Sequence, residues 1–227
     1  MLGEILPPGT AAAEFFGDIP EVRLLPAEER ALGNALPHRR SEFGTARAAA
    51  RRALTRLGLP PLAVPADPRG VPQWPDGVTG SITHCADYRA CAVARTTDVR
   101  VLGIDAEPDR PLSAAVVRTI AVPAERTHLV DLEWSGGAQV AWDRLLFSAK
   151  EAAFKAVFPQ ARIELDFPDV EIAINPAAGT FTARLPSVVR RAQGGLPALL
   201  PGRWLARSGL LVTAVALPTN QPGGVDG

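Results

Sequence analysis

The chain has 227 residues, of which 47% are hydrophobic and 21% charged, and its 24 basic residues balance 24 acidic ones. This length and composition predict one or two compact globular units and argue against a disordered chain. The zero net charge argues against a dedicated nucleic-acid binder, whose affinity depends on many phosphate contacts.

The cysteine content and the distribution of apolar residues further limit the class of protein to which the chain can belong. Cys85 and Cys91 are too few for a disulfide framework or a four-cysteine zinc site, so we expect a reducing, cytoplasmic compartment. Residues 1–10 lack the basic and apolar regions of a secretory signal, and no apolar run reaches the length of a transmembrane helix. We therefore expect neither nucleic acid nor membrane as a partner. Among the 24 basic residues only Lys150 and Lys155 are lysines, which draws attention to the segment that holds them.

The first half of the chain predicts helices followed by strands. Residues 26–36 form a short helix candidate, and the Ala, Leu and Arg content of residues 39–57 favours a longer helix. A loop rich in Pro and Gly comes next. Three strand-like runs separated by short turns are then expected to pair as antiparallel neighbours, at residues 78–83, 90–96 and 99–106.

The second half repeats this order. A helix is predicted at residues 142–158, where Pro159 is expected to end it. Four strand-like runs follow, at residues 170–175, 180–185, 202–206 and 210–217.

The repeated order predicts an α+β fold of two similar subdomains that meet at an interface. We place them at residues 1–106 and 107–218, followed by a disordered tail at 219–227. Ligand sites are common at such interfaces.

Two acidic residues close the third strand-like run. Asp105 and Glu107 are two positions apart, so on an extended chain they share a face. A divalent cation such as Mg²⁺ would relieve their mutual repulsion and suits oxygen ligands. The alternative interpretation is a solvated strand end with ordinary surface acids.

The helix at 142–158 carries an acidic residue in an apolar stripe. Phe147, Phe154 and Phe158 fall on one face, and Glu151 lies among them, flanked by the two lysines. A carboxylate there is costly unless it pairs or binds a metal. Together with the acids of the strand, this arrangement suggests a site for Mg²⁺ and a phosphate. The alternative is a surface ion pair between Glu151 and Lys155, four residues apart.

Weaker signals lie in the first half. Thr83 and His84, at the end of a predicted strand, offer a hydroxyl and an imidazole to an anion, although such a histidine is more often structural. We interpret the arginine-rich helix at 39–57 mainly as one with a solvent-exposed face, from which some guanidinium groups could bind phosphates. Arg69 has the same potential, and Gly70 permits close backbone approach.

These motifs, in this order, resemble the Sfp-type 4′-phosphopantetheinyl transferases, particularly the branch of the enterobactin-synthetase and actinobacterial enzymes. The resemblance runs from about residue 39 to 159 and rests on WPDGVTGSITHC (74–85), LGIDAEP (102–108) and WDRLLFSAKEAAFKAVFP (142–159). It implies two α/β subdomains related by pseudo-two-fold symmetry. Each would be a small, mainly antiparallel sheet packed on a long helix, with the active site between them.

The resemblance also implies roles for individual residues. Mg²⁺, or Mn²⁺ in its place, would be held by Asp105, Glu107, Glu151 and the backbone carbonyl of Ala106. Coenzyme A would be bound by residues from both halves, namely Arg39, Arg47, Arg69, Gly70, Thr83, His84, Asp105, Lys150, Glu151 and Lys155. Among these, His84, Lys150, Glu151 and Lys155 would be catalytic, with Glu151 as general base and the lysines at the pyrophosphate.

The implied reaction transfers 4′-phosphopantetheine from coenzyme A to a serine of an apo acyl or peptidyl carrier protein and releases 3′,5′-ADP. We expect a cytoplasmic monomer that serves polyketide or nonribosomal peptide synthases in antibiotic or siderophore biosynthesis. Two alternatives stay open. One is a Mg²⁺-dependent hydrolase of the coenzyme A pyrophosphate, and the other a non-enzymatic RNA- or nucleotide-binding module that uses the arginine-rich helix.

Overall fold

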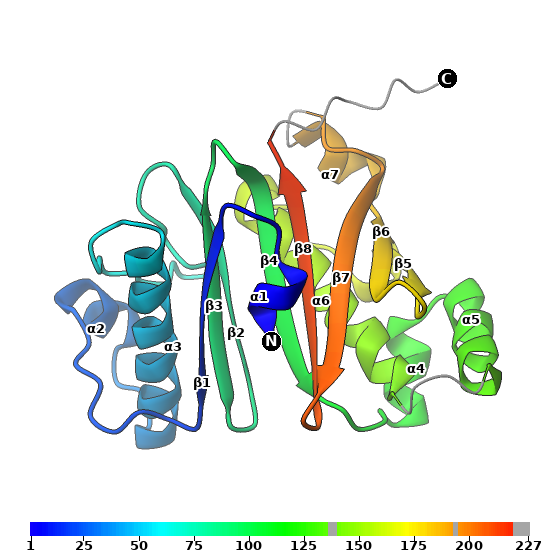
Figure 1. Cartoon of the computed structure of the whole chain (residues 1–227), viewed down its shortest axis with the longest axis horizontal. Coiled ribbons are helices and arrows are strands. Elements are labelled where there is room, and N and C mark those ends of the chain that lie inside the picture. Colours follow the sequence, from blue (N-terminus) through cyan, green and yellow to red (C-terminus); the bar gives the residue numbers. More distant parts are fainter. Residues whose placement is uncertain (136–139, 193–194, 220–227) are drawn as a thin grey trace.

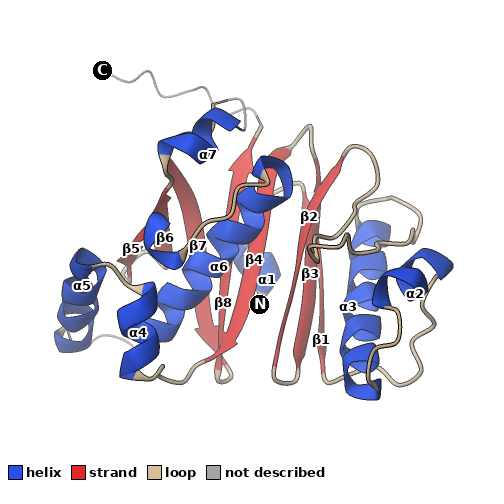
Figure 2. Ribbon diagram, turned by 180° about the vertical axis from the view of Figure 1, so that it is seen from behind, coloured by secondary structure: helices blue, strands red, loops and turns tan. Residues whose placement is uncertain are grey.

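The computed structural model describes residues 1–135, 140–192 and 195–219. Two antiparallel sheets stand next to each other, with a long helix packed on each (Figures 1 and 2). The first sheet has the strand order β1-β3-β2 and the second β4-β8-β7-β6-β5. The chain is therefore α+β with antiparallel sheets, as the sequence predicts. None of the helices in these ranges is long and apolar enough to cross a membrane.

The strands of the two sheets are β1 Thr10–Phe16, β2 Val78–Cys85, β3 Tyr88–Arg95, β4 Val99–Pro108, β5 Glu171–Asn175, β6 Thr180–Arg184, β7 Leu199–Arg207 and β8 Leu210–Pro218. The helices are α1 Leu2–Ile5, α2 Pro26–Leu32, α3 Pro37–Arg56, α4 Ala114–Ile120, α5 Pro123–Trp134, α6 Trp142–Ala161 and α7 Ser187–Ala192, with a 3₁₀ turn at Phe167–Asp169.

Helix α3 packs on the first sheet through small side chains. Its buried face carries Ala49, Ala50 and Ala53, each fully buried, against Cys91 and Val93 of the central strand β3. Alanine combines high helix propensity with a small side chain, so the helix forms readily and lies close to the sheet. Because α3 packs directly on this sheet, the packing determines where the arginines of α3 begin relative to β2 and β3.

Helix α6 crosses the second sheet at still closer range. A Cβ atom added to Gly103 of β4 would lie 2.0 Å from the carbonyl oxygen of Ala152 and 2.5 Å from the amide nitrogen of Ala156. The strand and the helix are thus in backbone contact at this glycine. This contact fixes the acids that follow Gly103 relative to the charged residues of α6.

Two elements, β4 and α6, differ from the sequence-based expectation. Strand β4 does not pair with β3, because β1 and β2 already occupy both edges of β3, and β4 pairs with β8 instead. The change of sheet therefore precedes Val99, whereas the predicted boundary at residue 106 falls inside β4. Helix α6 does not end at Pro159 but continues to Ala161, where Arg162 adopts a left-handed conformation.

At the ends of the chain, one strand lies outside the sequence-based prediction and the first residue of the predicted tail is described. Strand β1 was missed, because the alanine-rich sequence of Thr10–Phe16 lacks the β-branched pattern of a typical strand. Of the predicted tail, Thr219 is described and its amide donates to the carbonyl of Asp98 at 3.0 Å. The other residues of the tail, 220–227, lie outside the described ranges.

Candidate active site

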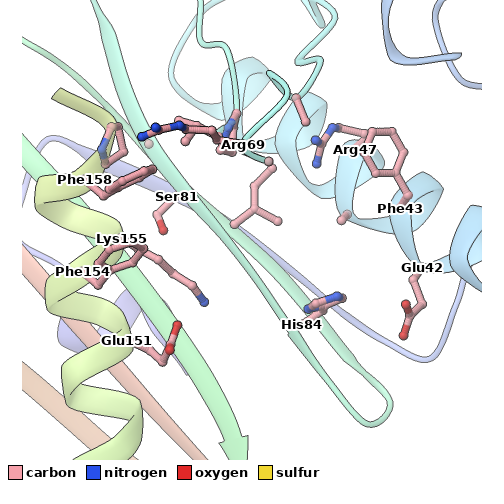
Figure 3. Close-up of a pocket in the computed structure, with 18 of the residues that line it drawn as sticks. Glu42, Phe43, Arg47, Arg69, Ser81, His84, Glu151, Phe154, Lys155 and Phe158 are labelled. Atoms are coloured by element: carbon pink, nitrogen blue, oxygen red, sulfur yellow. The ribbon is translucent and has the colours of Figure 1, made fainter. Parts of the chain in front are cut away.

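A cleft of about 580 Å³ lies between α3, the loop at residues 66–72, strand β2 and the C-terminal half of α6 (Figure 3). Its walls bring together most of the residues that the sequence singled out. Those in the lining are Arg39, Arg47, Arg69, Gly70, His84, Glu151 and Lys155. One wall belongs to each half of the chain, so the cleft exists only where the halves meet.

Arg47 is the deepest cation on the α3 side. Its side chain is buried, its guanidinium lies 4.0 Å from the centre of the Phe43 ring, and its Nε atom has no hydrogen-bond partner in the described part of the chain. Burial lowers the pKa of Arg47 to about 10, which still leaves it charged at neutral pH. A buried cation with an unused donor favours an anionic ligand.

Arg39 and His84 meet across the cleft floor. Nη1 of Arg39 lies 3.0 Å from Nε2 of His84. A guanidinium can only donate, so Nε2 must accept, and the neutral imidazole then carries its proton on Nδ1. Burial lowers the pKa of His84, Arg39 lowers it further, and nearby Glu42 opposes both.

Arg69 is more exposed and lies on the loop above the cleft. Its guanidinium pairs with Glu164 at 3.3 Å and lies 5.9 Å from the ring centre of Phe158. Gly70 next to it has a φ of 81°, the left-handed conformation that permits the turn. The loop thus places Arg69 at the rim of the cleft, as a third cation besides Arg39 and Arg47.

The acidic residues form the other end of the site. Asp105 is buried, and its Oδ1 atom accepts hydrogen bonds from Nζ of Lys155 at 2.6 Å and from the hydroxyl of Thr83 at 3.1 Å. Its Oδ2 atom is buried without a hydrogen-bond partner among the described residues. Glu107 pairs with Arg144 at 2.9 Å.

Burial and the charge of Asp105 together raise the pKa of the two neighbouring carboxyl groups. Burial raises the pKa of Glu151, and the charge of Asp105 raises it further while Lys155 opposes the rise. Burial likewise raises the pKa of Glu107, again with a contribution from Asp105 and against the effect of Arg144. The surface ion pair between Glu151 and Lys155 that the spacing allowed is not among the ion pairs of the described chain, and Lys155 is bound to Asp105 instead.

These residues fit a divalent cation, although they do not form a closed cage. The buried, unpartnered Oδ2 of Asp105 is a hard oxygen ligand without a proton donor, and the charge of Asp105 contributes to the raised pKa of Glu107 and of Glu151. Within the described ranges, no group of three His, Cys, Asp or Glu side chains is close enough to hold an ion. Since Mg²⁺ usually keeps several waters and binds through one or two carboxylates, Asp105 with one neighbour would suffice.

Five predicted site residues are not among those that line the cleft: Thr83, Asp105, Ala106, Glu107 and Lys150. The ammonium of Lys150 points away from it and is bound to Glu125 at 2.9 Å and to the carbonyl oxygens of Phe167 and Val170 at 2.8 and 2.7 Å. It borders a smaller cavity of about 190 Å³ on the other side of Glu151. Thr83 is buried behind Asp105 and does not line the cleft. Neither the side chain of Thr83 nor that of Lys150 is placed to reach a pyrophosphate held in the cleft.

Sequence reasoning also overlooked several partners of the site. Glu42, Glu164, Arg144 and Glu125 each hold one of the site's charged groups or a neighbour of one. Glu42 lies three residues after Arg39 on the same helix, so the i,i+3 spacing could have found this pair. The other three pairs lie at separations that no local spacing rule connects, up to 95 residues for Arg69 and Glu164, so pairing opposite charges along the sequence could not have found them.

The arginine-rich helix does not present a free basic face. Arg40 pairs with Glu29, Arg51 pairs with the buried Glu28 at 2.7 Å, and Arg56 donates to the carbonyl oxygen of Ala12. These arginines tie α3 to α2 and β1. The structure therefore offers little support for an RNA-binding module built on this helix.

The fold and the site define a two-sheet α+β protein with a cationic cleft and an acidic end between its halves. The family model of the 4′-phosphopantetheinyl transferase N-terminal domain matches residues 27–94, and that of the 4′-phosphopantetheinyl transferase superfamily matches residues 101–193. The chain belongs to the 4′-phosphopantetheinyl transferases of the Sfp type, in the actinobacterial branch, and is an enzyme of that class.

Similar proteins cover almost the whole chain. It is 48% identical to the 4′-phosphopantetheinyl transferase Svp of Streptomyces mobaraensis over 224 residues, which are 96% of this chain and 89% of the relative. It is 40% identical to PptT of Mycobacterium tuberculosis, covering 91% and 92% of the two chains. The enterobactin synthase component D of Escherichia coli matches at 34% identity over 103 residues, 44% of this chain and 46% of that protein.

Proposed function

We propose that this enzyme takes 4′-phosphopantetheine from coenzyme A and attaches it to a serine of apo acyl or peptidyl carrier proteins, in a Mg²⁺-dependent reaction that releases 3′,5′-ADP. The observation that carries the proposal is the cleft lined by Arg39, Arg47 and Arg69 from one half and by Lys155 from the other, with Lys155 bonded at 2.6 Å to the buried Asp105. A nucleotide with several phosphates and a pyrophosphate matches this distribution of charge. The active site then lies at the interface of two halves that we expect to be related by pseudo-two-fold symmetry.

The three arginines would bind the nucleotide end of the donor. Arg47 has an unused buried donor and Arg69 reaches the rim from the Gly70 turn, so the two can hold a phosphate from opposite sides. His84, neutral and donating through Nδ1, would offer a hydrogen bond to a phosphate oxygen. These contacts orient the donor so that its pyrophosphate lies toward Lys155.

Asp105, with Glu107, Glu151 or the backbone carbonyl of Ala106, would hold the Mg²⁺ ion, or Mn²⁺ in its place. When bound, the ion supplies positive charge to the pyrophosphate and so favours its cleavage. Lys155 adds a second positive charge at the same end and stabilises the oxygen that departs with 3′,5′-ADP.

Glu151 would act as the base for the incoming serine. Its carboxylate lines the cleft and has no ion-pair partner within the described residues, and burial has raised its pKa toward the range of a useful base. The serine Oγ attacks the phosphorus that bears pantetheine, and the bond from that phosphorus to the bridging oxygen breaks. The serine proton passes to Glu151, directly or through a water molecule. Lys150 has no direct part in this scheme, because its ammonium is buried on the other side of the helix.

We further propose a monomer that works in the cytoplasm without nucleic acid or membrane. Its expected carriers are those of polyketide and nonribosomal peptide synthases, in antibiotic or siderophore pathways, as the resemblance to an enterobactin synthase component suggests. Light scattering on the purified protein tests the oligomeric state.

Mass spectrometry of the carrier tests the reaction. The enzyme is incubated with coenzyme A, Mg²⁺ and a panel of apo carrier proteins, and each carrier is expected to gain one phosphopantetheine. Glu151→Gln should fold normally yet lose transfer. Disappearance of coenzyme A without any gain of carrier mass would instead establish the pyrophosphate hydrolase, and no change in either would refute the proposed function.

A further inference from the structure

Strands β2 and β4 lie side by side although they belong to different sheets (Figures 1 and 2). Side-chain hydroxyls join them. The hydroxyl of Ser81 accepts a hydrogen bond from the amide of Ile104 at 3.1 Å, and the hydroxyl of Thr83 accepts one from the amide of Ala106 at 3.1 Å. These two bonds form a seam between the halves of the molecule, in which β2 hydroxyls satisfy the amides of β4.

Thr83 makes one contact that Ser81 does not. A hydroxyl has a single proton to donate, and because the amide of Ala106 must itself be the donor, the proton of Thr83 is free for another acceptor. That acceptor is Oδ1 of Asp105, at 3.1 Å. Both side chains are almost fully buried, Thr83 at 2% and Asp105 at 4% exposure. A hydrogen bond to a charged group in such surroundings is among the stronger ones in proteins.

The carboxylate of Asp105 is consequently held from both halves. Thr83 of the first sheet and Lys155 of α6 both donate to Oδ1, while Oδ2 is left buried and unpartnered among the described residues. Fixing one oxygen in this way determines where the other oxygen points. Thr83 itself does not line the cleft, in contrast to its neighbour His84.

From this geometry we infer that Thr83 is a positioning residue that orients Asp105 across the seam, and not a ligand of the coenzyme A phosphates. The inference rests on the proposed function, which assigns Asp105 to the cation. Groups that orient metal ligands in this way typically contribute about 10- to 100-fold in metal affinity or activity. The same hydroxyl ties the acidic end to the strand that carries His84.

The test compares Thr83→Val with Thr83→Ser. Valine keeps the shape of threonine without its hydroxyl, and serine keeps the hydroxyl. We expect Thr83→Val to lower kcat about 10- to 100-fold and to weaken Mn²⁺ binding, followed by electron paramagnetic resonance with saturating coenzyme A, about tenfold. Its Kd for coenzyme A in the absence of metal should stay within about twofold, and Thr83→Ser should restore both kcat and Mn²⁺ affinity.

Ser81→Ala is the matched control for the seam, because Ser81 bonds to Ile104 without touching Asp105. It should lower Tm, because the amide of Ile104 loses its acceptor, while Mn²⁺ affinity stays unchanged. A weaker Kd for coenzyme A with unchanged Mn²⁺ affinity in Thr83→Val would overturn the inference, as would equal loss of Mn²⁺ affinity in Ser81→Ala.

Asp105→Asn separates this inference from the function on which it rests. If Asp105→Asn loses Mn²⁺ binding while Thr83→Val behaves as the unsubstituted enzyme, the positioning role of Thr83 is wrong and the proposed function stands. If Asp105→Asn keeps full transfer and Mn²⁺ affinity, the assignment of Asp105 in the proposed function fails first.

Discussion

The ammonium of Lys150 lies 2.9 Å from Oε2 of Glu125, and both side chains are only 2% exposed. Two carbonyl oxygens complete the shell of the ammonium, and the amides of Val122 and Ile172 donate to the Glu125 carboxylate. The pair therefore joins α5, α6 and the start of β5. Such fully bonded buried pairs matter mainly because breaking them leaves an uncompensated charge.

Lys150→Met should accordingly destabilise the protein by about 3–5 kcal/mol, because Glu125 remains buried without its cation. The free energy of unfolding in urea measures the change. The double variant Glu125→Gln with Lys150→Met should recover part of the loss, since neither charge is then present. A stability change below about 1 kcal/mol in Lys150→Met would show that the pair is not structural, and that the ammonium is available for the cleft after all.

Lys150 and Lys155 show which parts of the site could be predicted from the sequence and which could not. Strand and helix periods indicated which acids share a face of β4 and which charges share a side of α6, whereas the contact between Asp105 and Lys155 is seen only in the structure. Lys150 lies one residue before Glu151 and so points about 100° away around the helix. Only knowledge of the segment that packs against Lys150 could place its ammonium. Glu125 lies in α5, in a region for which the sequence indicates only a loop and mixed helical character without bounds. Strand β4 was assigned to the wrong sheet for a related reason, because strand pairing depends on which edges remain open.

Arg47→Met should weaken binding of 3′,5′-ADP about 10- to 100-fold, because a charged donor in a buried setting contributes strongly to a phosphate contact. Calorimetric titration measures the Kd. Unlike the loss of Lys150, this loss should leave Tm unchanged or raise it, since Arg47 is a buried cation with an unpartnered Nε atom.

Arg51 on the same helix provides the control for Arg47. Arg51 pairs with the buried Glu28 at 2.7 Å and does not line the cleft. Arg51→Met should therefore lower Tm with little effect on the Kd for 3′,5′-ADP. The reverse pattern in the two variants would refute the assignment of Arg47 to the nucleotide.

His84 should make the protein less stable in mild acid. Its pKa is lowered below the ordinary value of 6.5 by burial and by Arg39, so the native state takes up a proton less readily than the unfolded chain. Stability is therefore lost as the pH falls through 6.5 toward the lower native pKa, and is retained above 6.5. His84→Gln should lose less unfolding free energy between pH 7.5 and 5.5 than the unsubstituted protein. His38→Gln, at an exposed histidine that does not line the cleft, is the control variant measured in parallel.

Gly103→Ala should destabilise the protein by about 1–3 kcal/mol or more and sharply reduce transfer, because its Cβ atom has no room beside the backbone of α6. Thermal unfolding and the carrier assay measure the two effects. Gly3→Ala is the control, since nothing lies within 4 Å of its added Cβ. A Gly103→Ala protein with normal Tm and normal transfer would mean that strand and helix can separate without consequence.

The contact at Gly103 has a consequence for how the enzyme can change over evolutionary time. Strand β4 and helix α6 are locked together and carry Asp105, Glu107, Glu151 and Lys155, whereas Arg39, Arg47 and Arg69 come from the other half. The residues proposed for metal binding and catalysis are therefore held together in one half of the molecule, and the arginines proposed to bind the donor lie in the other. Substitutions in the half that carries the arginines can therefore change the affinity for the donor while β4 and α6 keep the reactive groups in place, provided that a hydroxyl persists at position 83 to link the two halves.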